Sequence, residues 1–115
     1  SETELGAIAA SMVNRCIYCA AVHASRYIQL TKDGTVIEGL FDAGENAELE
    51  PRPRAIVNFA TRLSRCPSEA GYADMKQLID VGLGMDEILD VILTASLFGW
   101  ANRLMHVLGD PIAQE

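Results

Sequence analysis

The sequence predicts an all-α fold. Apolar residues recur at three- and four-residue intervals along most of the chain, and clusters of glycine, proline and asparagine separate these segments. No segment reads as a strand. A length of 115 residues is that of one domain, so we expect a single domain over residues 1–115.

The same patterns place the helices along the chain. Six are expected, over residues 2–12, about 15–30, 35–41, 51–66, 72–81 and 85–108. Asn14 marks the first break, because asparagine is poor inside helices and good as an N-cap. Pro51 and Pro53 mark a helix start, and Gly109 followed by Pro111 marks the end of the last helix.

The last predicted helix is apolar on nearly every side, which predicts burial on every side. A bundle of this size has little room for such a helix, so we expect a subunit interface there. Phe98 and Trp100 are expected to be packing anchors, and His106 to be a satisfied core or interface histidine. The longest uncharged apolar run, residues 91–101, is too short to cross a bilayer, which takes about 20 residues.

Charge and cysteine content exclude several classes of protein. Nine Lys and Arg against 16 Asp and Glu give a net charge of −7, which argues against nucleic acid or an anionic membrane as a partner, since both need clustered Lys and Arg. Three cysteines cannot form a fully paired secreted framework, and no signal peptide is visible. We therefore expect a cytoplasmic protein. The arginines at 52, 54, 62 and 65 are expected to be solvated or ion-paired, and Cys66 to be a lone structural thiol.

The chemistry concentrates between residues 14 and 23. Cys16 and Cys19 share one face at the start of a helix, where free N–H groups and the helix dipole stabilise a thiolate. His23 lies one turn beyond Cys19, so an imidazole base is within reach of a thiol. A second thiol can resolve the oxidised first one as a disulfide. Two alternatives stay open: a zinc site using both cysteines and His23, and two thiols packed as small apolar residues.

With Glu4 twelve residues before it, this segment resembles the E…N-x-C-x-x-C-x-x-x-H signature of the AhpD-like alkylhydroperoxidases. These proteins belong to the carboxymuconolactone decarboxylase superfamily, and the C-x-Y-C form resembles its peroxidase-related branch. Residues 49–55 resemble that branch's LSPRERAL segment, residues 86–90 its D-x-EILD, and residues 98–104 its FNFxNRL. The resemblance thus covers nearly the whole chain.

The resemblance implies an AhpD-like helical bundle that reduces hydroperoxides. Cys19 would attack the peroxide, Cys16 would close the disulfide and meet the reductant, and His23 with Glu4 would relay the proton. It also implies a dithiol reductant of protein or lipoyl type, a homo-oligomer (trimer or hexamer), and no cofactor or metal. Branch members carry further N-terminal helices, so Ser1 is expected to be a truncated or processed start.

Several points depart from this pattern or compete with it. Tyr18 stands where better-studied members have a second histidine, so it and Asn14 are candidate supporting residues. Ser1 and Glu4 also fit an S-x-x-E capping box, and a straight helix would separate Glu4 from Cys16 by about 18 Å. The relay therefore requires the chain to fold back near Asn14. The alternative functions are a non-catalytic helical oligomer, a metal-binding interaction domain, or a carboxymuconolactone decarboxylase-like activity.

Overall fold

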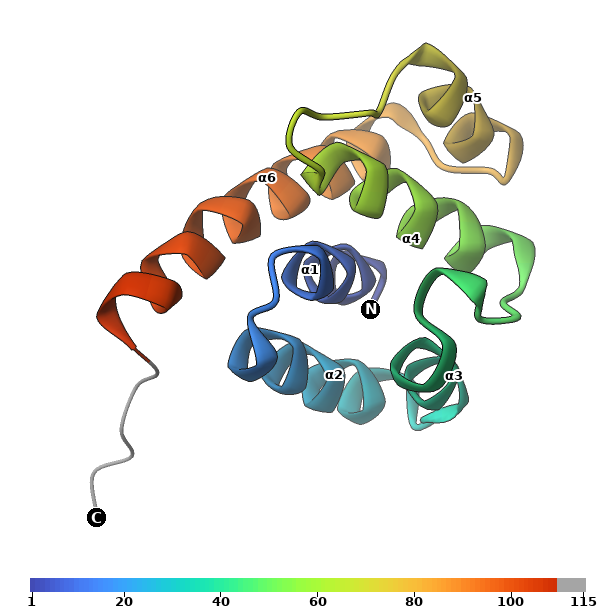
Figure 1. Ribbon diagram of the computed structural model, residues 1–115. Helices are drawn as coiled ribbons and strands as arrows, with labels where there is room; N and C mark the ends of the chain where they lie inside the picture. Colours follow the sequence, from blue (N-terminus) through green and yellow to red (C-terminus); the bar gives the residue numbers. More distant parts are fainter. Residues whose placement is uncertain (110–115) are drawn as a thin grey trace.

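The computed structural model describes residues 1–109, and Figure 1 shows their arrangement. The elements are α1 (Glu2–Val13), α2 (Ile17–Thr31), α3 (Thr35–Ala43), a 3₁₀ turn η1 (Gly44–Asn46), α4 (Pro51–Ser64), α5 (Tyr72–Asp80) and α6 (Met85–Leu108). No strand occurs in this described part of the chain, so the predicted all-α class is confirmed. The predicted stop at Pro111 lies outside the described residues.

Helix α1 is the centre of the fold. It contacts α2, α4 and α6, and Figure 1 shows it enclosed between them. Seven consecutive residues, from Leu5 to Ser11, are buried, which requires neighbours on every side of the helix. Many of them are small, so the surrounding helices can pack closely against α1. The core therefore sits around the helix that carries Glu4.

The helix boundaries differ from the prediction where capping decides them. Asn14 is the C-cap of α1 rather than an N-cap, and Cys16 is the N-cap of α2. Helix α4 ends at Ser64, two residues before the predicted end, and Arg65 is already extended. The residue before a proline avoids helical backbone, which ends the helix ahead of Cys66 and Pro67.

Helix α6 buries one stripe of its surface and leaves the opposite stripe uncovered. The buried residues recur at helical spacing: Ile88, Val91, Ala95, Gly99 and Asn102. The exposed apolar face consists of Met85, Leu89, Leu93, Leu97, Trp100, Leu104, Val107 and Leu108. The helix is thus apolar on both sides, as predicted, but a single chain covers only one of them.

This exposure bears on two expectations for α6. Trp100 is 60% exposed, so it anchors no packing within the chain, whereas Phe98 does pack against the core. His106 is exposed in the single chain, so it is not a core histidine, but its Nε2 contacts the Asn14 carbonyl, so the side chain is satisfied as expected. By length and composition alone α6 is apolar enough to cross a membrane. A core helix of a soluble protein passes the same test, and α6 does pack its buried stripe on α1 and α4.

Arg52, Arg62 and Arg65 are ion-paired, as one of the two sequence interpretations proposed. Arg52 bridges Glu2 and Glu87, tying α4 to α1 and α6. Arg62 pairs with Asp74 across α4 and α5. The Arg52 contacts fix the relative positions of three helices near the start of α1, at the opposite end of that helix from the cysteine motif, whereas the Arg62–Asp74 pair joins α4 to α5.

Candidate active site

A sharp turn between α1 and α2 places the cysteine motif. Arg15 adopts left-handed backbone with φ 57°, and Cys16 follows in extended backbone as the N-cap of α2. The Cys16 N–H donates to the Ser11 carbonyl at 2.9 Å. The chain therefore reverses within three residues, and α2 runs back along α1. This is the fold-back that the predicted proton relay requires.

The two motif cysteines lie together at the start of α2. Their sulfurs are bonded to each other, and their Cα atoms are 5.3 Å apart. Both residues are buried. The Cys19 N–H points at the Cys16 sulfur, 3.3 Å away, so Cys16 takes up one of the free N–H groups at the start of the helix. The structure thus brings the predicted dithiol pair into bonding distance.

The fold-back also brings Glu4 to His23. The Glu4 Oε2 to His23 Nδ1 distance is 2.5 Å, and the two side chains are only 14% and 16% exposed. The ring of Phe98 meets the imidazole edge to face at 4.3 Å. With Nδ1 held by a carboxylate, Nε2 is the ring nitrogen left to exchange a proton, and no described residue bonds it.

Helix capping does not explain Glu4. Ser1 is the N-cap of α1, but its side chain makes no capping hydrogen bond, so the capping-box interpretation is wrong. The second carboxylate oxygen of Glu4 accepts a hydrogen bond from Arg26 Nε at 3.0 Å. Both oxygens of this nearly buried carboxylate are therefore directed at α2.

The candidate supporting residues have different surroundings. Tyr18 is exposed and makes no side-chain hydrogen bond within the described residues. Asn14 donates from Nδ2 to Asn102 Oδ1 at 3.3 Å. The sequence analysis assigned no role in the site to Arg26, and Asn102 entered it only within residues 98–104, the segment that resembles FNFxNRL. Arg26 lies one helical turn beyond His23, so its spacing could have predicted that it shares the Glu4 carboxylate. Asn102 is far from the motif in sequence, so no spacing indicates its contact with Asn14.

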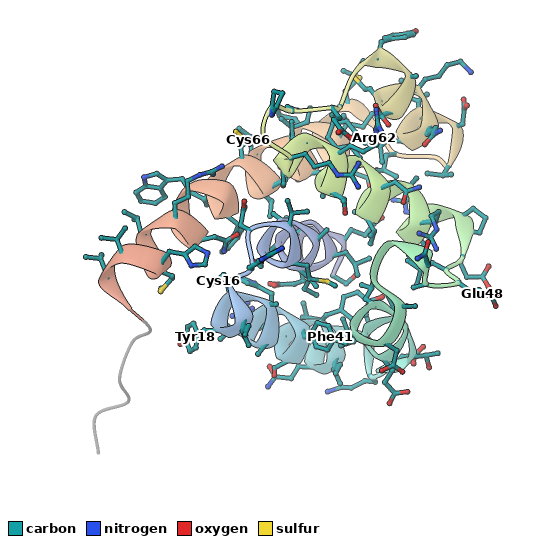
Figure 2. The ribbon with its side chains drawn as sticks, viewed as in Figure 1. Cys16, Tyr18, Phe41, Glu48, Arg62 and Cys66 are labelled. Carbon is teal, nitrogen blue, oxygen red and sulfur yellow. A yellow bond between two sulfur atoms is a disulfide. The ribbon has the colours of Figure 1, made fainter. Side chains whose placement is uncertain are left out.

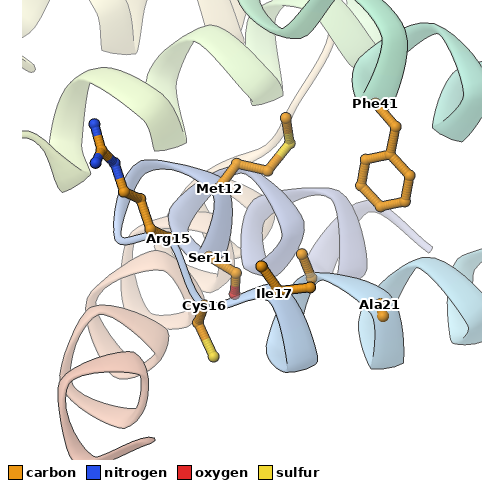
Figure 3. Close-up of a pocket in the computed structure, with 8 residues that line it drawn as sticks. Ser11, Met12, Arg15, Cys16, Ile17, Ala21 and Phe41 are labelled. Carbon is orange, nitrogen blue, oxygen red and sulfur yellow. The ribbon is translucent and has the colours of Figure 1, made fainter. Parts of the chain in front are cut away.

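An apolar pocket of about 510 Å³ flanks the turn (Figure 3). It lies among α1, α2 and α3, and its wall includes Cys16 but not Cys19. The other lining residues are Ser11, Met12, Arg15, Ile17, Ala20, Ala21 and Phe41. In Figure 3, Arg15 and Phe41 lie on opposite sides of Met12. This pocket has the apolar character that the alkyl part of an organic molecule requires.

The third cysteine lies apart from this site. Figure 2 shows Cys66 beyond the end of α4, well separated from Cys16. Its thiol is free, so Cys66 is the lone thiol that was expected, and it is exposed. Within residues 1–109 no group of three or more His, Cys, Asp or Glu side chains is arranged to hold a metal ion.

Two solved structures are similar to this chain in both fold and sequence. A peroxidase-related protein from Silicibacter sp. TM1040 is 29% identical with a TM-score of 0.79. A peroxidase-related protein from Ralstonia eutropha JMP134, described as an alkylhydroperoxidase AhpD core, is 26% identical with a TM-score of 0.80. Each match covers 92% of this chain but only 56% of the solved one. Neither a family model nor a curated protein matches the sequence.

Proposed function

We propose that this chain, which is AhpD-like in fold and similar to peroxidase-related proteins, is a thiol-dependent peroxidase that reduces hydroperoxides. One observation carries the proposal. The turn at residues 14–16 places a bonded Cys16–Cys19 pair at the start of α2 and a nearly buried Glu4–His23 pair between α1 and α2, with His23 one helical turn beyond Cys19. A thiol pair beside an oriented base is the arrangement that nucleophilic sulfur chemistry needs.

In the proposed oxidative step, the Cys19 thiolate attacks the terminal oxygen of the hydroperoxide. The O–O bond breaks, the alkoxide takes a proton and leaves as an alcohol, and Cys19 becomes a sulfenic acid. His23 exchanges the proton through Nε2, while Glu4 holds Nδ1 and stabilises the charged ring. The loss of either His23 or Glu4 should therefore slow the same proton transfer.

In the reductive steps, Cys16 attacks the sulfenic sulfur of Cys19. The S–S bond forms, the S–O bond breaks, and the departing hydroxide takes a proton to become water. A dithiol reductant of protein or lipoyl type then attacks the disulfide, is itself oxidised to a disulfide, and returns both cysteines to thiols. The apolar pocket beside Cys16 supports a reductant with an apolar part as its occupant, because Cys16 is the cysteine that meets the reductant in this scheme.

A peroxidase assay tests this proposal. The reduced protein is given hydrogen peroxide or cumene hydroperoxide, with dithiothreitol, dihydrolipoamide or thioredoxin as the electron donor. We expect catalytic loss of peroxide and, without donor, loss of two thiols per chain with a mass decrease of two hydrogens at Cys16 and Cys19. Cys66→Ser is the control and should behave like the wild type. A tightly held zinc ion, or a Cys16–Cys66 disulfide, would contradict the assignment.

The alternative, a helical interaction domain with inert cysteines, has one feature in its favour, the exposed apolar face of α6. We propose that neighbouring subunits of the same enzyme cover this face, in a trimer or hexamer. A contiguous row of eight exposed apolar residues on one helix is more than a monomer in water ordinarily presents.

This assembly makes a testable prediction. Replacing Leu93 and Leu97 with glutamate places charge in the centre of the face and should dissociate the oligomer, as measured by light scattering at micromolar concentration. Leu30→Glu on α2 is the matched control, because Leu30 is similarly exposed but lies outside the face. A monomeric wild type, or an α6 variant with unchanged mass, would rule out this interface.

A further inference from the structure

The buried side-chain amide of Asn102, on α6, forms hydrogen bonds to the turn that carries Cys16. Asn102 is completely buried, although it is polar. Its Nδ2 donates to Ser11 Oγ at 3.2 Å, and its Oδ1 accepts from Asn14 Nδ2 at 3.3 Å. Ser11 and Asn14 are the residues on either side of the point where α1 ends. One side chain therefore binds both sides of the break in the chain.

The turn depends on contacts of this kind. Arg15 is held in left-handed backbone, which a residue with a Cβ adopts only when its surroundings impose it. The Ser11 carbonyl accepts the Cys16 N–H, so the residue that Asn102 binds also fixes the Cys16 backbone. One turn further along α6, His106 contacts the Asn14 carbonyl. Helix α6 thus holds the backbone that presents the Cys16 sulfur.

A buried asparagine is costly unless its hydrogen bonds are satisfied, and a leucine would fill similar space without that cost. Both polar atoms of Asn102 are used on the turn. We propose that Asn102, acting through Asn14 and Ser11, is a positioning residue that holds Cys16 in place to resolve the oxidised Cys19. This inference rests on the proposed peroxidase function.

The chemical consequence is a competition for the sulfenic acid. When Cys16 attacks the Cys19 sulfur, the S–S bond forms and hydroxide leaves to become water. If that attack is slow, the sulfenate instead attacks a second hydroperoxide, whose O–O bond breaks to give an alcohol and a sulfinic acid on Cys19. The rate of the first route depends on how well Cys16 is placed, and the second route does not involve Cys16.

The experiment compares Asn14→Ala and Asn102→Leu with the wild type under pulses of cumene hydroperoxide. Mass spectrometry gives the ratio of sulfinic acid to disulfide at Cys19. We expect the ratio to rise about three- to tenfold in Asn14→Ala, the effect of one lost hydrogen bond of ordinary strength, and at least as much in Asn102→Leu, which loses two. The rate of the first oxidation should stay unchanged. Asn14→Ala keeps the test valid if Asn102→Leu fails to fold, because Asn14 is only partly buried.

Val91→Ala is the matched control, because it destabilises the buried stripe of α6 without touching the turn. Its ratio of sulfinic acid to disulfide should equal that of the wild type. A rise as large as in Asn14→Ala would mean that Asn102 only stabilises the fold and does not position Cys16. Equal ratios in all proteins would also overturn the proposal. Closure of the disulfide by oxidised glutathione needs no peroxide and should slow in the same two variants. If closure slows but no protein reduces peroxide, the positioning role stands and the peroxidase assignment fails.

Discussion

Replacing Cys19 with serine is expected to abolish hydroperoxide reduction and the trapping of any sulfenic acid in the motif. Two effects decide which of the two cysteines is the reactive one, and they favour different residues. The start of α2 favours Cys16, its N-cap, but a helix dipole contributes only about 0.3–1 kcal/mol at exposed sites. A positioned base contributes typically about 10²–10⁴-fold, and His23 follows Cys19 by one helical turn. The base should decide in favour of Cys19.

The matched variant is Cys16→Ser, which should still form a sulfenic acid at Cys19 but fail to turn over. Dimedone labelling followed by mass spectrometry locates the modified cysteine in both proteins, and Cys66→Ser in each background removes the exposed third thiol from the measurement. Sulfenic acid at Cys16 in the Cys19→Ser variant, formed at near wild-type rate, would reverse the two roles.

The sequence predicted the local structure well because its signals are local. Helical periodicity and proline placed the start of α4, and the full extent of α6, Met85–Leu108, agrees with the prediction. The break after α1 was predicted from Asn14, but its capping role was not. N-cap and C-cap preferences overlap for asparagine, so only the backbone decides between them.

The contacts between distant segments were beyond sequence reasoning. Asn102 lies 88 residues from Asn14, and nothing near it in the chain indicates that its amide binds the cysteine turn. The partner of Glu4 was expected only from the family resemblance, since local spacing favoured a capping role. The exposed face of α6 is a second feature that the sequence could not predict. Periodicity predicted an apolar surface but could not separate the stripe buried in the chain from the uncovered one.

Replacing His23 with alanine is expected to slow peroxide reduction by about 10²–10⁴-fold near neutral pH, the range that a positioned general base supplies. The loss should shrink as the pH rises, because an unassisted thiol ionises by itself at about pH 8.5 and then needs no base. The measurement is the rate of Cys19 oxidation by a stopped-flow peroxide assay between pH 6 and 10, for the wild type and for His23→Ala.

Two further variants separate the base from the groups that orient it. Glu4→Gln keeps an oxygen facing Nδ1 but removes the negative charge, so its rate should fall between those of the wild type and His23→Ala. Arg26→Gln should change the rate little, because Arg26 is 62% exposed and its ion pair with Glu4 is screened by water. If His23→Ala reacted at the wild-type rate at pH 7, the thiolate would form without the imidazole. The nearly buried contact between Glu4 and His23 would then serve only to join α1 to α2.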